Sequence, residues 1–309
     1  MTMAELSALN EQFALHDQLV FREGPGGLGI CEISNGHAVA SVALQGAQLL
    51  SWIPRGEQPV IWLSRDARFE VGRSIRGGVP VCWPWFGPHA TQPSFPAHGF
   101  VRTAPWRVCE TKILEDGATF VAFRVTRTDT TDVFWPHIAE LELAVKVGVT
   151  LEFDLVTRNT GSESITIGEA LHSYFSVGDV RHITVEGLER CAYIDKLDSG
   201  KRKQQPGPVV FDAETDRIYL DAGAECLIND PRMQRRIRIV KSGSRSTVVW
   251  NPWVDKAKRM GDMGENGYLN MVCVESGNAA DDVVTIAPGD EHHLQVSYRL
   301  ESLAGKRAP

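Results

Sequence analysis

Hydrophobic and polar residues alternate with a period of two in one segment after another of this 309-residue chain. In the segment 141–147, leucine and valine occupy every second position, and glutamate, alanine and lysine lie between them. The same pattern returns at 121–125, 151–155 and 296–300. A period of two places successive side chains on opposite faces, so it indicates β-strands with one buried face and one face in water.

The fold class follows from what separates these strands. No long helical pattern lies between them, which disfavours βαβ units and a parallel sheet. Glycine and proline clusters interrupt the chain instead, for example at 24–29, 77–80 and 288–289. The sequence therefore predicts an all-β fold, built as a large antiparallel β-sandwich.

Neither a Pro/Ser-rich linker, a break in composition nor an internal repeat divides the chain, so we predict one β-sandwich domain over residues 20–301. Residues 1–19 form a predicted N-terminal extension with a short surface helix, because apolar residues recur there at helical spacing. We expect 302–309 to be a frayed tail. The very polar segment 195–208 is predicted to be a mobile loop.

Charge and cysteine content limit the possible partners. The 39 acidic and 32 basic residues give a net charge of -7, whereas a general nucleic-acid binder carries a basic surplus. A small anion is still possible, because a few local arginines can hold it. The six cysteines are too sparse for a disulfide scaffold, and neither a signal peptide nor a membrane-spanning apolar stretch is visible. We therefore expect a cytoplasmic monomer or weak dimer that binds neither nucleic acid nor membrane.

The segment 73–102 is the most unusual part of the sequence. It holds too many prolines for a plain strand, and its aromatic residues argue against disorder, so we predict a long structured loop. The side chains of Trp83, Trp85 and Phe86 either line a site for sugar rings or fill the core beneath the loop.

Two arginines and a histidine in this loop are candidate binding residues. Arg76 directly precedes a Gly-Gly pair, where the backbone can approach a ligand closely. His98 and Arg102 lie near the other end of the loop. Together the three side chains are suited to clamp an anion or a hydroxyl group, and the alternative for each arginine is a surface ion pair.

Three residues outside the loop are candidates as well. His172 is either a satisfied core residue or a proton carrier near neutral pH. Glu275 ends the apolar run 271–274, where burial would raise its pKa, so it is a candidate general base or one half of a structural ion pair. Asp216 lies in an acidic segment that either binds hydroxyl groups or forms a solvated turn.

Motifs for other chemistries are missing from the sequence. It contains no glycine-rich phosphate loop in a strand-to-helix context, no histidine pair at metal-binding spacing and no nucleophile elbow. Acid–base chemistry without a cofactor or a metal is what remains.

Five stretches, in this order, resemble the aldose 1-epimerase (galactose mutarotase-like) superfamily: IRGGVPVCWPWFGP, PAHGFVR, LHSYF, DRIYL and VCVE. The IRGGVP form is similar to the hexose-6-phosphate mutarotase branch, also called glucose-6-phosphate 1-epimerase. The resemblance covers roughly residues 20–300. It implies a β-supersandwich and an isomerase that interconverts the α and β anomers of a phosphosugar without a cofactor.

The resemblance also implies roles for individual residues. The family's catalytic histidine and glutamate fall on His172 and Glu275. Its substrate-binding positions fall on Arg76, Arg102 and Asp216, with His98 beside them. Some members have a glutamine where this chain has Ala97, so any hydrogen bond from that glutamine is absent here or is supplied elsewhere.

Mutarotation opens a cyclic hemiacetal and recloses it on the other face. Opening needs a base for the anomeric hydroxyl and an acid for the ring oxygen. We expect ionised Glu275 as the base and protonated His172 as the acid, since opposite charges near each other favour the charged form of both.

Other functions stay open at this point. The same fold supports a free-aldose 1-epimerase or a non-catalytic carbohydrate-binding protein. A glycoside-cleaving enzyme would use two carboxylates, for which Asp216 and Glu275 are available. A metal-dependent cupin is a more distant possibility.

Overall fold

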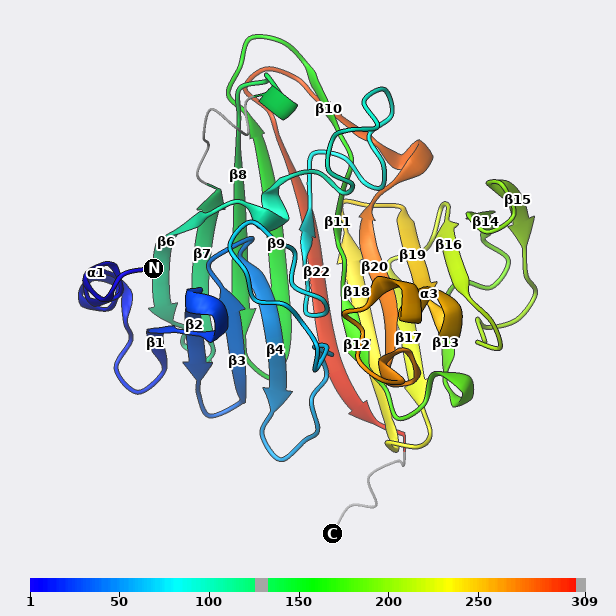
Figure 1. The fold of residues 1–309 in the computed structure, drawn as a ribbon, viewed down its shortest axis with the longest axis horizontal. Coiled ribbons are helices and arrows are strands. Elements are labelled where there is room, and N and C mark those ends of the chain that lie inside the picture. Colours follow the sequence, from blue (N-terminus) through cyan, green and yellow to red (C-terminus); the bar gives the residue numbers. More distant parts are fainter. Residues whose placement is uncertain (126–132, 304–309) are drawn as a thin grey trace.

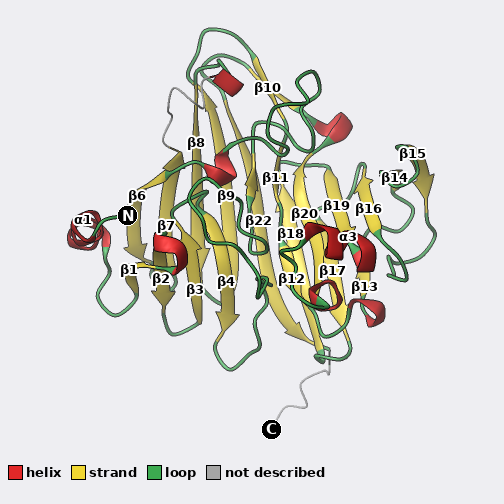
Figure 2. Cartoon of the chain, in the orientation of Figure 1, coloured by secondary structure: helices red, strands yellow, loops and turns green. Residues whose placement is uncertain are grey.

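The computed structural model describes residues 1–125 and 133–303. The predicted frayed tail therefore lies outside the described residues from position 304 onward. Strands dominate the described part of the chain, as Figure 2 shows.

The strands form four sheets, and every pair of neighbouring strands within them is antiparallel, which confirms the predicted all-β fold. A four-stranded sheet contains β1 (Leu19–Glu23), β2 (Gly29–Ser34), β3 (Ala38–Ala43) and β4 (Gln48–Pro54), and a two-stranded sheet contains β10 (Ile165–Ile167) and β21 (Val284–Ile286).

Two eight-stranded sheets make up most of the sandwich. The first large sheet contains, in spatial order, β15 (Lys201–Gln204), β14 (Ala192–Asp195), β16 (Thr215–Tyr219), β19 (Ser246–Asn251), β20 (Met271–Asn278), β11 (Glu169–Leu171) and β5 (Val81–Cys82), with β12 (Tyr174–Ser176) also paired to β20. The second large sheet contains β13 (Thr184–Glu186), β17 (Glu225–Asp230), β18 (Arg235–Ser242), β22 (Glu291–Ser302), β9 (Thr150–Asn159), β8 (Ala139–Val147), β7 (Thr119–Val125) and β6 (Trp106–Ile113).

The main core lies between the second large sheet and the sheets packed against it. Strand β8 alternates strictly between buried and half-buried residues, as its sequence pattern predicts. One continuous cluster of buried side chains joins β8 and β9 to the four-stranded sheet and to the first large sheet. Figure 1 shows β2, β3 and β4 lying over β7, β8 and β9. Burial of this apolar face is the main term that stabilises the sandwich.

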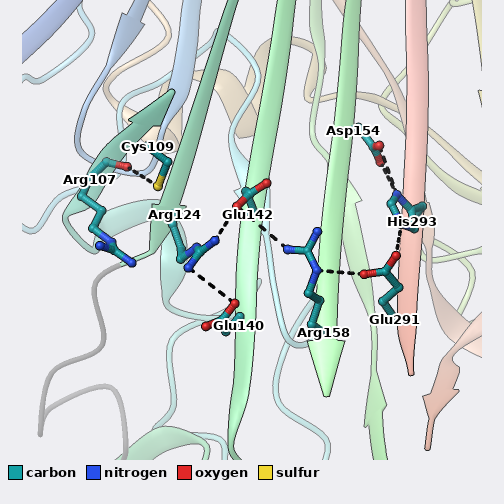
Figure 3. Close-up of polar contacts among 9 residues, drawn as sticks. All are labelled: Arg107, Cys109, Arg124, Glu140, Glu142, Asp154, Arg158, Glu291 and His293. Atoms are coloured by element: carbon teal, nitrogen blue, oxygen red, sulfur yellow. Dashed lines mark hydrogen bonds and ion pairs between the residues drawn. The ribbon is translucent and has the colours of Figure 1, made fainter. Parts of the chain in front are cut away.

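The opposite face of the second large sheet carries charged side chains (Figure 3). The guanidinium of Arg124 on β7 donates to Glu142 on β8 over 2.9 Å. Farther across the sheet, Arg158 on β9 donates to Glu291 on β22 over 2.8 Å. Pairs of opposite charge thus link neighbouring strands on the outer face, whereas apolar packing links them on the inner face. The charged pairs confirm that these strands have one face in water.

The helices are short and lie outside the sheets. Helix α1 (Met3–Phe13) begins with a capping box, in which Thr2 and Glu5 bond to each other's backbone N–H groups. Helix α3 (Trp253–Met260) follows β19. Short 3₁₀ helices occur at Pro25–Gly27, Val101–Thr103, Val180–His182, Gly267–Asn270 and Ala280–Asp282. No helix in the described ranges is long and apolar enough to cross a membrane.

The prediction of a mobile loop at 195–208 is wrong for residues 195–204. Strands β14 and β15 pair there as a hairpin at the edge of the first large sheet. Three of the four residues of β15 are exposed and none is buried, so the strand has no apolar period for the sequence to display. Backbone hydrogen bonds to β14 fix it instead.

The predicted structured loop at 73–102 has the expected irregular course, with only β5 as a strand. Its Gly-Gly pair does allow a close backbone approach. Both Gly77 and Gly78 have positive φ, and a Cβ on Gly78 would lie 2.3 Å from the carbonyl oxygen of Leu49. A side chain there is excluded both by the conformation and by the space, so the pair fixes the backbone directly after Arg76.

Candidate active site

One cavity of about 190 Å³ brings the predicted site residues together. They come from four separate parts of the chain: the loop 73–102, the turn between β11 and β12, β16 and β20. The predicted residues among its lining are Arg76, His98, Arg102, His172, Asp216 and Glu275. Strand β20 pairs antiparallel with β11, β12 and β19. This pairing brings site residues that are far apart in the sequence close together in the structure.

A larger hollow, of about 630 Å³, lies against the four-stranded sheet. The charged residues that line it are Asp17, Arg22 and Glu32, and all three are exposed. Arg22 and Glu32 pair with each other, with 3.1 Å between Nε and Oε2. Because catalytic acids and bases need shifted pKa values, the smaller cavity with its buried titratable groups is the candidate active site.

His172 and Glu275 form a contact inside the cavity. Nε2 of His172 lies 3.4 Å from Oε1 of Glu275. The Glu275 side chain is 1% exposed and the His172 side chain 12%. Oε2 of Glu275 and Nδ1 of His172 have no hydrogen-bond partner among the described residues. A buried carboxyl and an imidazole in contact, each with spare hydrogen-bonding capacity, are suited to pass protons to and from a bound molecule.

Aromatic rings hold the imidazole of His172 in place. The ring of Tyr174 stacks on it with 4.9 Å between centroids, and Trp250 meets it edge-on at 6.0 Å. The ring of His98 lies 5.6 Å away. This packing fixes the orientation of His172, and it removes water that would otherwise stabilise its charged form.

The pKa shifts of His172 and Glu275 are opposite in direction to those expected from the sequence. Burial raises the pKa of Glu275 well above its ordinary value, and the charge of Asp216 adds to the effect. Burial also lowers the pKa of His172 well below its ordinary value, with Arg102 and Arg76 acting in the same direction. The prediction that proximity favours both charged forms is therefore wrong for the unliganded protein. Loss of hydration outweighs the mutual attraction and shifts both pKa values toward the neutral forms of Glu275 and His172.

A buried neutral glutamate makes stability depend on pH. Above the ordinary pKa of 4.5 the unfolded chain ionises at Glu275, whereas the folded protein keeps the proton until its own, higher pKa is reached. Glu275 therefore contributes a loss of about 1.4 kcal/mol of unfolding free energy for each pH unit in that interval. The lowered pKa of His172 acts in the opposite direction below pH 6.5, so the loss is measured as the difference between the wild type and a variant without the carboxyl group. We expect Glu275→Gln to remove this loss.

Urea unfolding from pH 4 to pH 8 measures the effect. The variant should gain stability over the wild type progressively as the pH rises, because glutamine does not ionise. A difference between the two proteins that stays constant with pH would show that Glu275 is ionised in the folded protein.

The cations of the cavity differ in how far they are already paired. Arg76 donates from Nε to Asp262 and from Nη1 to the hydroxyl of Tyr174, both over 3.0 Å. Arg102 donates from Nη2 to the carbonyl oxygen of Ala97 over 2.8 Å. In the predicted clamp, two side chains hold Arg76 and a backbone carbonyl holds Arg102.

His98 lies in the cavity but carries no positive charge. Burial lowers its pKa to about 3, and Arg102, Lys196 and Arg76 act in the same direction. Its backbone N–H donates to the carbonyl oxygen of Gly87 over 2.7 Å, and this bond joins two parts of the loop 73–102. A neutral imidazole is suited to hydrogen-bond a hydroxyl group rather than to neutralise an anion.

Asp216 lies beside a lysine that the sequence analysis did not identify. Nζ of Lys256 is 3.6 Å from Oδ2 of Asp216 and 2.9 Å from Oε1 of Glu214. Lys256 comes from α3, a helix for which no periodic signal was found. Lys196, a second missed lysine, follows β14 and also lines the cavity. The only sequence signal for Lys196 was the polarity of its segment.

The aromatic residues of the loop have different positions. Phe86 is part of the cavity lining. Trp83 is 3% exposed, belongs to the main core and donates to Thr157 over 3.0 Å. Trp85 donates to the carbonyl oxygen of Pro96 within the loop. Neither tryptophan is among the described residues that line the cavity.

One group of side chains has the composition of a metal site. Ligand atoms of His172, Cys273 and Glu275 lie within 4.8 Å of one another. Cys273, however, is fully buried, and burial raises its pKa well above the ordinary value. The thiolate that a metal needs is thereby disfavoured, so this group fits the packing beneath the His172–Glu275 pair better than a metal centre.

Comparisons with known proteins point to one family. The sequence matches the family model for aldose 1-epimerase over residues 30–299. A candidate glucose-6-phosphate 1-epimerase of Escherichia coli (strain K12) is 41% identical over 274 residues, which cover 88% of this chain and 90% of that protein. One of Cenchrus ciliaris is 35% identical over 261 residues, covering 82% and 78%.

A solved structure extends the similarity to the fold. The crystal structure of a candidate mutarotase from Salmonella typhimurium has a TM-score of 0.87 and 35% sequence identity to this chain. The match covers 94% of this chain and 96% of that one.

Proposed function

Because the chain belongs to the aldose 1-epimerase family, we propose that this isomerase interconverts the α and β anomers of a hexose 6-phosphate, with Glu275 and His172 as the acid–base pair. The observation that carries the proposal is the 3.4 Å contact between these two side chains in a cavity that also contains four cations. The similarity to candidate glucose-6-phosphate 1-epimerases supports a phosphorylated substrate.

The charge of the cavity supports a phosphosugar as well. Arg76, Arg102, Lys196 and Lys256 line it on a protein whose net charge is -7. A surplus of local cations on an acidic protein favours a small anionic ligand over a large one. In the proposal these cations and Asp216 bind the phosphate and hydroxyl groups, and neutral His98 bonds a hydroxyl.

Ring opening in this proposal moves two protons. Glu275 takes the proton of the anomeric hydroxyl, the bond between the anomeric carbon and the ring oxygen breaks, and His172 gives a proton to that oxygen. The product is an open-chain aldehyde. Rotation about the bond between the first two carbons presents the other face, and the same transfers in reverse close the ring.

The pKa directions of the pair imply a proton transfer between Glu275 and His172 before the ring opens. While the ring is closed, the pair must be ionised, with Glu275 negative and His172 positive. Opening discharges both groups and leaves the neutral pair that burial favours in the unliganded protein. Because burial favours the neutral pair before the substrate reacts, a proton first passes from Glu275 to His172 within their 3.4 Å contact, and ring opening then returns both groups to their neutral forms.

A coupled assay tests the proposed function. Freshly dissolved α-glucose 6-phosphate is mixed with a dehydrogenase specific for the β anomer, and product formation is followed with and without the protein. We expect the protein to raise the rate above the spontaneous one in proportion to its concentration. A rate that does not change would refute the assignment.

The compartment is part of the proposal. All six cysteines are free thiols, four of them buried. Free thiols fit a reducing environment, so we place the enzyme in the cytoplasm.

A further inference from the structure

Tyr174 contacts two groups of the cavity that have different tasks in the proposed function. Its ring stacks on the imidazole of His172, with 4.9 Å between the centroids and 12° between the planes. Its hydroxyl accepts a hydrogen bond from Nη1 of Arg76 over 3.0 Å. The residue lines the cavity and is 2% exposed. One rigid side chain thus contacts both the proposed acid and a proposed substrate-binding arginine.

The phenol ring is itself held by two tryptophans. Trp62 stacks on it, with 5.8 Å between the centroids and 20° between the planes. Trp250 meets it edge-on at 6.0 Å. All three rings belong to one buried cluster. Close packing of this kind restricts the phenol ring to one orientation, and the imidazole stacked on it is restricted with it.

Backbone pairing fixes Tyr174 relative to both halves of the site. Its N–H donates to the carbonyl oxygen of Gly78 over 3.0 Å, and its carbonyl oxygen accepts from the N–H of Trp62 over 2.9 Å. Gly78 belongs to the loop 73–102. Tyr174 also lies opposite Cys273 of β20, the strand that carries the proposed base. The residue is therefore tied to the backbone of the binding loop and to that of the catalytic strand.

The hydroxyl of Tyr174 acts on Arg76 differently from the second partner of that arginine. Asp262 forms an ion pair with Nε over 3.0 Å and offsets the charge of the guanidinium. Burial raises the pKa of Tyr174, so its hydroxyl stays neutral. It therefore holds Nη1 in place without cancelling more of the positive charge that attracts an anionic substrate.

We propose that Tyr174 is a positioning residue with two separable roles: its ring orients His172 for proton transfer to the ring oxygen of the substrate, and its hydroxyl orients Arg76 for substrate binding. This inference rests on the proposed function. It predicts that loss of the hydroxyl weakens binding, whereas loss of the ring slows the chemical step.

Steady-state kinetics of Tyr174→Phe test the role of the hydroxyl. Phenylalanine keeps the ring and its stacking and removes only the acceptor for Arg76. KM for glucose 6-phosphate should rise about 3- to 10-fold, with kcat within about two-fold of the wild-type value. A KM that stays at the wild-type value would refute the role of the hydroxyl.

Tyr219→Phe is the matched control. The hydroxyl of Tyr219 also accepts from an arginine, Nη1 of Arg217, over 3.4 Å, and Tyr219 is fully buried in the first large sheet. It is not among the described residues that line the cavity. The control should leave both KM and kcat within about two-fold of the wild-type values.

Tyr174→Met tests the role of the ring. Methionine fills irregular space in a core but has no flat face on which an imidazole can stack. A displaced His172 is badly placed to reach the ring oxygen, so kcat should fall about 10-fold or more below that of Tyr174→Phe. Equal kcat values for the two variants would refute the role of the ring.

Trp62→Leu provides the same test if Tyr174→Met does not fold. It loosens the phenol ring from a position that is not among the described residues lining the cavity. It should lower kcat and change KM little. A kcat that stays at the wild-type value would refute the role of the ring.

A binding measurement separates a failure of this inference from a failure of the proposed function. Isothermal titration calorimetry with glucose 6-phosphate needs no turnover. If the wild type shows no anomerization, the proposed function fails. Weaker binding by Tyr174→Phe than by Tyr219→Phe would still support the contact that orients Arg76, and equal binding would overturn it. If the wild type is active and both Tyr174 variants share its constants, the inference is refuted and the proposed function stands.

Discussion

Replacing Glu275 with glutamine is expected to lower kcat for the anomerization of glucose 6-phosphate by about 10²–10⁴-fold, with KM changed little. Glutamine keeps the size of the side chain and one acceptor oxygen, so the substrate should still bind. It cannot take the proton of the anomeric hydroxyl. The coupled assay with freshly dissolved α-glucose 6-phosphate measures both constants.

Glu142→Gln is a suitable control for this variant. Glu142 lies on the charged outer face of the second large sheet, where it accepts from Arg124 (Figure 3). The substitution removes the same carboxyl group away from the cavity, so kcat should equal that of the wild type. Full activity in Glu275→Gln would mean that another residue acts as the base.

Replacing His172 with asparagine is expected to cause a loss of similar size, about 10²–10⁴-fold in kcat. Asparagine is polar and smaller, but it has no titratable nitrogen that could protonate the ring oxygen. The rings of Tyr174 and Trp250 contact each other directly and would still line the cavity beside position 172. Steady-state kinetics with glucose 6-phosphate measure the loss.

The double variant His172→Asn/Glu275→Gln shows whether the two residues act as one unit. In the proposed mechanism the two proton transfers belong to one ring opening, and neither residue is useful alone. The double variant should therefore be about as slow as the slower single variant. If the two losses multiply, the residues act independently and the proposed coupling through their shared contact is wrong.

The strand pattern made the fold predictable, because each long strand has one face in the core and one in water. Strand β8 alternates in sequence as it does in burial. Edge strands and short helices lack this signal. Strand β15 consists of three basic residues and a glutamine, paired through its backbone with β14, and α3 is only eight residues long. The sequence analysis predicted neither of these two elements.

The candidate site was predictable where the residues themselves are unusual. A glutamate at the end of an apolar run and arginines in a loop rich in proline and glycine stand out in the sequence, and the cavity contains them. Lys196 and Lys256 do not stand out, since lysine in a polar segment is common at any protein surface. Their positions depend on strand pairing across the first large sheet.

The protonation of the pair could not be predicted from residue types. Opposite charges favour each other at a solvated site, and the sequence does not show how much hydration is lost. The structure does: the Glu275 side chain is 1% exposed and that of His172 is 12% exposed. Burial of this degree changes the direction of both expected pKa shifts.

Exchange spectroscopy by NMR on glucose 6-phosphate at anomeric equilibrium tests the central claim most directly, because it needs no coupling enzyme and no net reaction. The anomeric protons of the two forms give separate signals, and exchange between them reports opening and reclosure of the ring. We expect wild-type protein to raise the exchange rate above that of the protein-free sample, and Glu275→Gln to return it close to the protein-free rate. An exchange rate with wild-type protein equal to the spontaneous one would contradict the account.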